Sequence, residues 1–167
     1  MKKSFKTVLV AGLCAAMMSV GLLGGCAGAN SALDDETAKN RQFMASVNQV
    51  MVDIQSSLDG FNDAVGAGDV VAMKTQLDNT ADCLEALNKI EAPAGLGDIK
   101  QDYVDGATAL QSALGDYITL YSEIAAATAD APFDWNAYGD RVAAITASYQ
   151  DGIAKLQAGD EAAASKE

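Results

Sequence analysis

The chain has 167 residues, enough for one modest domain, and carries 11 basic and 23 acidic residues, three cysteines and no histidine, for a formal net charge of −12. A sequence without histidine cannot form Ser-His or Cys-His catalytic pairs or any histidine-containing metal site. The acidic balance argues against nucleic acid as a partner, because phosphate binding requires a basic surface.

The first 25 residues have the layout of a signal peptide. Residues 1–6 contain three lysines and no acid, and the segment Thr7–Leu23 carries no charge. As a membrane helix, these 17 residues would rise only about 25 Å, less than the roughly 30 Å of a hydrocarbon core. We therefore expect residues 1–25 to be removed on export.

The apolar segment ends in Leu23, Gly24, Gly25 and Cys26. This motif resembles the lipobox of bacterial lipoproteins, in which an aliphatic residue and two small residues precede a cysteine. The resemblance covers this segment alone. It implies cleavage between Gly25 and Cys26, a thioether-linked diacylglyceryl group on Cys26, and an amino terminus open to further acylation. The alternatives are an uncleaved anchor and an ordinary secretory signal in which Cys26 is incidental.

Lipidation would place the protein on the extracytoplasmic face of the cell membrane, or on the outer membrane of a cell that has two. Removal of residues 1–25 leaves 8 basic and 23 acidic residues, so the exported part has a net charge of −15. We predict that residues 26–35 form the lipidated cysteine and a tether. Because two acyl chains suffice for stable anchoring, the lipid would be the contact with the membrane.

From residue 36 to residue 158, apolar residues recur every three or four positions, which is typical of amphipathic helices. We predict helices over about 36–65, 69–90, 97–129 and 134–158, separated by Gly66-Ala67-Gly68, Pro93 and Pro132, with Asp69, Asp98 and Asp134 as N-terminal caps. Short loops make consecutive helices antiparallel, so the expected fold is an all-α, up-down-up-down four-helix bundle. A longer coiled coil is the alternative, although each apolar stripe ends at a Gly or Pro. Residues 159–167 have no large apolar side chain and are expected to be a flexible tail.

Cys83 lies at the edge of an apolar stripe, where it is either a redox thiol or, as we expect, a small buried side chain. Gly106 and Gly115 inside the third predicted helix allow a close helix contact, a bend or a groove. Trp135 and Tyr138 are predicted to anchor the fourth helix in the core. The segment from Asp134 opens like a calcium-binding loop but has Ile145 at the position that requires a glutamate.

Two rows of acidic residues lie at helical spacing, and we interpret them as solvated faces rather than a divalent-cation site; they are Asp78, Asp82 and Glu85, and Asp98, Asp102 and Asp105. No nucleophile stands with a base, and no phosphate-binding glycine loop is present. The sequence therefore predicts a lipid-anchored binding module of the cell envelope, without enzymatic activity, cofactor or metal, whose partner is an envelope protein or wall component. The alternative is a lipoprotein that binds a small ligand or a divalent cation.

Overall fold

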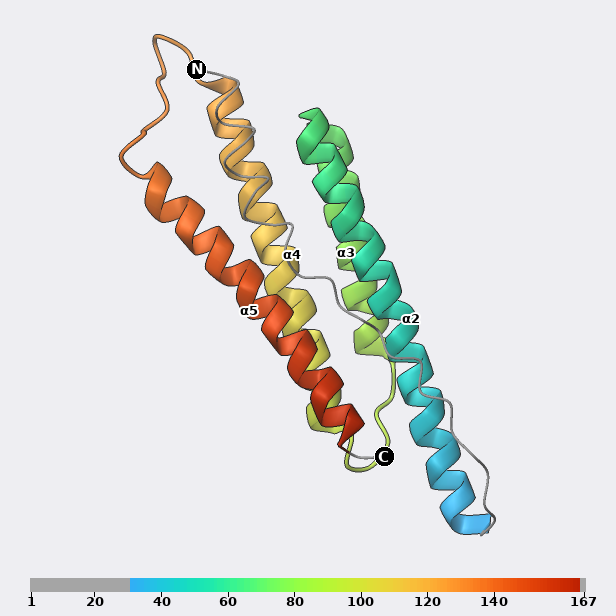
Figure 1. Cartoon of the computed structure of the whole chain (residues 1–167). Coiled ribbons are helices and arrows are strands. Elements are labelled where there is room, and N and C mark those ends of the chain that lie inside the picture. The colour runs from blue at the N-terminus through green and yellow to red at the C-terminus, as the bar shows by residue number, and fades with distance from the viewer. Residues whose placement is uncertain (1–30, 166–167) are drawn as a thin grey trace.

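The computed structural model describes residues 31–165, and this part of the chain consists of four helices with no strand (Figure 1). The helices are α2 (Ser31–Ala67), α3 (Val70–Lys89), α4 (Gly97–Ala126) and α5 (Tyr138–Ala164). The predicted all-α class is thus confirmed for this region. The predicted signal segment, Gly25 and Cys26 all lie outside the described residues.

The turn between α2 and α3 follows the predicted chemistry. Gly68 has a φ of +69°, a left-handed conformation that ends a helix at little cost for glycine. The N–H of Asp69 donates to the carbonyl of Ala64 at 2.9 Å, which closes the last turn of α2. The carboxylate of Asp69 then accepts the N–H groups of Val71 and Ala72, both at 3.0 Å, and so caps α3 as predicted.

Two other predicted caps are wrong. Asp98 lies inside the first turn of α4, whose cap position is Leu96, and no side chain there bonds to the helix backbone. Leu96 is buried instead, so its apolar contact sets the start of α4. Asp134 lies before α5, which begins at Tyr138, and its Oδ1 accepts the N–H of Asn136 at 2.9 Å in a local turn.

The helix ends also differ from the predicted ones. The first helix begins at Ser31, before the predicted start at Glu36, and α4 ends at Ala126 rather than Ala129. The last helix continues to Ala164, through most of the segment predicted as a tail. The reason is a contact with α4: the hydroxyl of Tyr103 donates to Asp160 Oδ1 at 2.6 Å.

The four helices share one apolar core. In sequence order, α2 packs against α3, α3 against α4, and α4 against α5 (Figure 1). The rings of Phe61 and Tyr117 meet edge to face at 5.6 Å and so link α2 to α4. The largest fully buried side chains are Tyr103, Phe61, Ile54, Met73, Leu87, Leu110, Leu114, Leu120, Leu156, Val47 and Thr80.

The contact of α4 with α5 depends on glycines. A Cβ added to Gly106 would lie 2.9 Å from the carbonyl oxygen of Gly152, and a Cβ added to Gly152 would lie 3.0 Å from that of Gly106. One further glycine of α5, Gly159, lies against the ring of Tyr103. Of the three roles considered for Gly106, close helix contact is the one observed.

None of the helices in the described part of the chain combines the length and the apolar character needed to cross a membrane.

We predict that Gly152→Ala lowers the free energy of unfolding by about 1–3 kcal/mol, because the new methyl group would meet Leu110 Cγ at 2.8 Å as well as the backbone of α4. Urea unfolding followed by far-ultraviolet circular dichroism measures this. Gly115→Ala is the matched control, since its Cβ would meet only Leu77 Cδ2 at 3.9 Å. The control gains helix propensity and should be more stable by up to about 1 kcal/mol. Equal stabilisation of both variants would contradict the close packing.

Candidate functional site

The connection between α4 and α5, residues 127–137, carries two rings that form an aromatic cluster with the first residue of α5, and one of the three rings is exposed. We call this segment the aromatic loop. The ring centroids of Phe133 and Trp135 lie 5.0 Å apart in an edge-to-face arrangement, and those of Trp135 and Tyr138 lie 5.7 Å apart. Phe133 and Tyr138 also pack against the core. Trp135 is 61% exposed, so its prediction as a core anchor is wrong.

Local hydrogen bonds shape the aromatic loop. The N–H of Thr128 donates to the carbonyl of Ala131 at 3.0 Å, and the N–H of Ala131 donates back to the hydroxyl of Thr128 at 3.1 Å. The turn at Asp134 and Asn136 follows. Because these bonds fix the backbone on both sides of Pro132, the position of Phe133 and Trp135 is defined by the loop and not by a helix.

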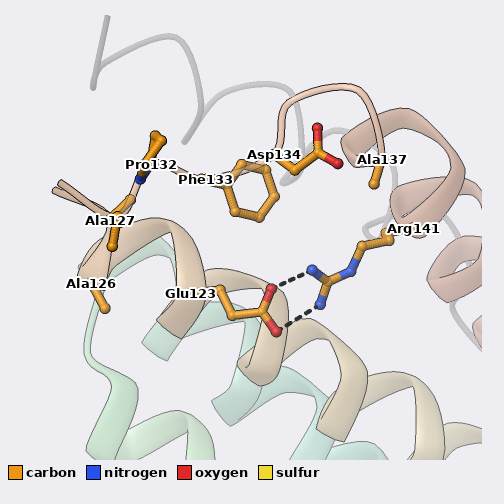
Figure 2. Close-up of a pocket in the computed structure, with 9 residues that line it drawn as sticks. Glu123, Ala126, Ala127, Pro132, Phe133, Asp134, Ala137 and Arg141 are labelled. Atoms are coloured by element: carbon orange, nitrogen blue, oxygen red, sulfur yellow. Dashed lines mark hydrogen bonds and ion pairs between the residues drawn. The ribbon is translucent and has the colours of Figure 1, made fainter. Parts of the chain in front are cut away.

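Beneath the loop lies an open hollow of about 390 Å³ between the end of α4 and the start of α5. Figure 2 shows the ring of Phe133 over this hollow, Asp134 at its edge, and Glu123 and Arg141 facing each other below. The guanidinium of Arg141 donates through both terminal nitrogens to the two carboxylate oxygens of Glu123. This bidentate pair joins α4 to α5 under the loop.

This end of the molecule carries a net negative charge. Hydrogen bonding to Arg141 holds the pKa of Glu123 below its usual value and raises that of Arg141. Every other charged residue from 123 to 141 is an aspartate, namely Asp130, Asp134 and Asp140, and all three are exposed. Among the described residues, none of these three forms an ion pair. The single cation of the region is therefore neutralised, and three carboxylates remain.

A second hollow, of about 460 Å³, lies between α3 and α4. Its lining includes Asp78, Asp116 and Gly115, so this glycine lines a groove. The predicted acidic rows do not converge there, because Asp78 is the only member of either row in the lining. Within residues 31–165, no three acidic or cysteine side chains come together in a way that could hold a metal ion.

Cys83 and two tyrosines lie in the core rather than in either hollow. Cys83 is 8% exposed, and burial, with Asp53 and Asp82 nearby, raises the pKa of its thiol. Burial also raises the pKa of Tyr117 to about 12, and that of Tyr103 is raised by burial and by its bond to Asp160. All three groups therefore stay protonated at neutral pH, which suits packing better than nucleophilic or base chemistry.

Comparison with known proteins adds no relative: no family model, curated protein or solved structure matches the chain significantly.

Sequence reasoning missed the aromatic loop because Trp135 and Tyr138 are three residues apart, a spacing that also fits one face of a helix. The usable signal was the turn-forming sequence that begins at Pro132 and continues through Asp134 and Asn136. Glu123 and Arg141 are 18 residues apart, and no local pattern could have paired them.

We predict that Glu123→Ala loosens the aromatic loop, because Arg141 then loses the carboxylate with which it forms its bidentate ion pair. Quenching of the single tryptophan by acrylamide measures this directly, and the quenching constant should rise. Glu85→Ala, which breaks the exposed pair with Lys89 on α3, is the control and should leave the constant unchanged.

The same pair gives the loop a pH dependence. Since the folded-state pKa of Glu123 is lowered, its stabilising effect is complete above the unfolded value near 4.3 and is lost as the pH falls through the folded value. Quenching in the wild type should therefore increase as the pH falls below that unfolded value, whereas Glu123→Ala should already show the higher constant at neutral pH. An unchanged constant in this variant would show that the pair does not hold the loop.

Proposed function

We propose that the protein is a lipid-anchored, non-catalytic lipoprotein of the cell envelope, folded as an up-down-up-down bundle, that binds an envelope protein or wall component through the aromatic loop. Cys26 is the proposed site of lipid attachment, after cleavage between Gly25 and Cys26. The proposed location is the extracytoplasmic face of the cell membrane, or the outer membrane where a second membrane exists.

The exposed Trp135 is the observation that carries the binding role. Large aromatic side chains bury much area at little entropic cost and dominate the energetics of many interfaces. Within the described part of the chain, Trp135 is one of three exposed large apolar residues, and the other two, Val52 and Val71, lie singly on helices α2 and α3. Among residues 35–165, it is only at the aromatic loop that an exposed ring belongs to a cluster, beside a hollow.

The geometry of α2 supports a binding surface that faces away from the membrane. Cys26, which we propose to be lipidated, comes shortly before Ser31, and the segment between them can span at most about 18 Å when fully extended. The helix that follows has 37 residues, so it rises about 55 Å from Ser31 to its end. The aromatic loop lies at the end of the molecule opposite to the start of α2 (Figure 1).

Charge supports anchoring by lipid rather than by protein surface. The chain that remains after the proposed cleavage has a net charge of −15, and anionic lipid would repel it within a Debye length of about 8–10 Å. Two acyl chains provide the affinity that the surface of the bundle lacks.

We predict that cells fed an alkyne analogue of palmitate label the wild-type protein and that Cys26→Ala abolishes the label, because the acceptor thiol is then absent. In-gel fluorescence of the immunoprecipitated chain measures the incorporation. Cys83→Ser is the matched control, since it removes the buried thiol and should keep the label. A wild type without label, or a Cys26→Ala variant that keeps it, would contradict the proposal.

A further inference from the structure

We propose that the aromatic loop recognises a basic segment of a protein partner, with a lysine or arginine side chain over the ring of Trp135 and its charge near Asp130 and Asp134. This inference rests on the proposed binding role and names the chemistry of the partner. It joins three observations: an exposed indole, its fixation by neighbouring rings, and a charge imbalance around it.

The indole is exposed but held in place. Phe133 packs edge to face on Trp135 with an interplanar angle of 75°, and Tyr138 contacts the same ring at an angle of 56°. Phe133 also meets Tyr138 at 6.4 Å, so the three rings form a closed set of contacts. Trp135 nevertheless keeps 61% of its surface open. A preorganised ring loses little freedom on binding, which favours it as an anchor.

The charges around the ring select a cation. Asp130 and Asp134 precede Trp135 within the loop, and Asp140 follows at the start of α5. All three are exposed and form no ion pair among the described residues. The one nearby cation, Arg141, is engaged by both oxygens of Glu123. A cation over an indole is attracted by the ring quadrupole, and the carboxylates add to this attraction.

The same charges disfavour a neutral wall saccharide as the occupant. A sugar could stack on an indole and donate hydroxyl hydrogen bonds to the carboxylates, but without a positive charge it gains less from them than a cation does. An anionic wall polymer would be repelled by them. A basic protein segment satisfies both the ring and the charges. A saccharide is therefore one of the probes, so that binding of a wall saccharide is tested directly.

The test uses the full chain purified from whole cells in an uncharged detergent, with tetra-arginine, acetylated and amidated, as the probe. Emission of Trp135, the only tryptophan, reports binding. We expect a saturable change with tetra-arginine that weakens as salt is raised from about 0.05 to about 0.5 M, because screening shortens the Debye length. Tetra-citrulline has nearly the same shape without the charge and should give no saturable change.

Two variants, measured by calorimetry, separate the ring from the charges. Trp135→Leu keeps an apolar side chain and should weaken binding by about two- to five-fold through loss of the cation–π contact. Asp130→Asn with Asp134→Asn should weaken it by about two- to ten-fold, while the asparagine at 134 keeps an oxygen for the N–H of Asn136. The matched control is Glu91→Gln with Asp98→Asn. It removes the same charge from exposed positions at the opposite end of the molecule and should have no effect.

Equal binding of tetra-citrulline would overturn the inference, because binding would then not depend on a positive charge. Equal loss of affinity in the loop double variant and in the control double variant would also overturn it, because the attraction would then depend on net charge alone. A response to a tetramer of N-acetylglucosamine without one to tetra-arginine would assign the loop to saccharide instead. Failure of all three probes would overturn the basic partner yet leave lipidation at Cys26 intact. Loss of the palmitate label would overturn anchoring without affecting this titration.

Discussion

The close contact of α4 with α5 at Gly106 and Gly152 is the constraint on which the rest of this arrangement depends. A side chain at either position would press on the backbone of the opposite helix, so the missing Cβ atoms set the distance between the helices. Ser148 strengthens the contact by donating its hydroxyl to the carbonyl of Ala109 at 3.1 Å. Since the aromatic loop joins these two helices, their contact, together with the ion pair of Glu123 with Arg141, decides where Trp135 is displayed.

The sequence predicted features that arise from local chemistry. The spacing of apolar residues indicated the helices, and Gly68 and Asp69 marked the first turn because a left-handed φ and a carboxylate cap are properties of single residues. The prediction from sequence was wrong where a residue far away in the chain determines the structure. Gly159 carries no apolar signal, yet its lack of a side chain lets Tyr103 pack against it and extends α5 to Ala164. The contacts of Trp135 likewise depend on the conformation of the loop, and the sequence did not show this because the spacing of its aromatic residues also fits one face of a helix.

The proposed function assigns different tasks to the two ends of the molecule. One end follows closely on Cys26 in sequence and would be held at the membrane by lipid. The other carries an exposed indole and three aspartates that form no ion pair among the described residues. The helix α2 rises roughly 55 Å from the first of these ends, a length well beyond the Debye length at physiological salt. Repulsion between the acidic bundle and anionic lipid then favours an upright orientation and does not interfere with the recognition of a basic partner.

The separation of the lipid anchor from the exposed ring is tested most directly by measuring the depth of Trp135 relative to the bilayer. The lipidated chain is reconstituted in vesicles, and quenching of its single tryptophan by brominated lipid is compared with quenching by aqueous acrylamide. We expect quenching by acrylamide and none by the lipid, because the aromatic loop would face away from the anchor. Strong quenching by brominated lipid would show that the exposed ring inserts into the membrane, and it would contradict the separation of anchor and binding surface.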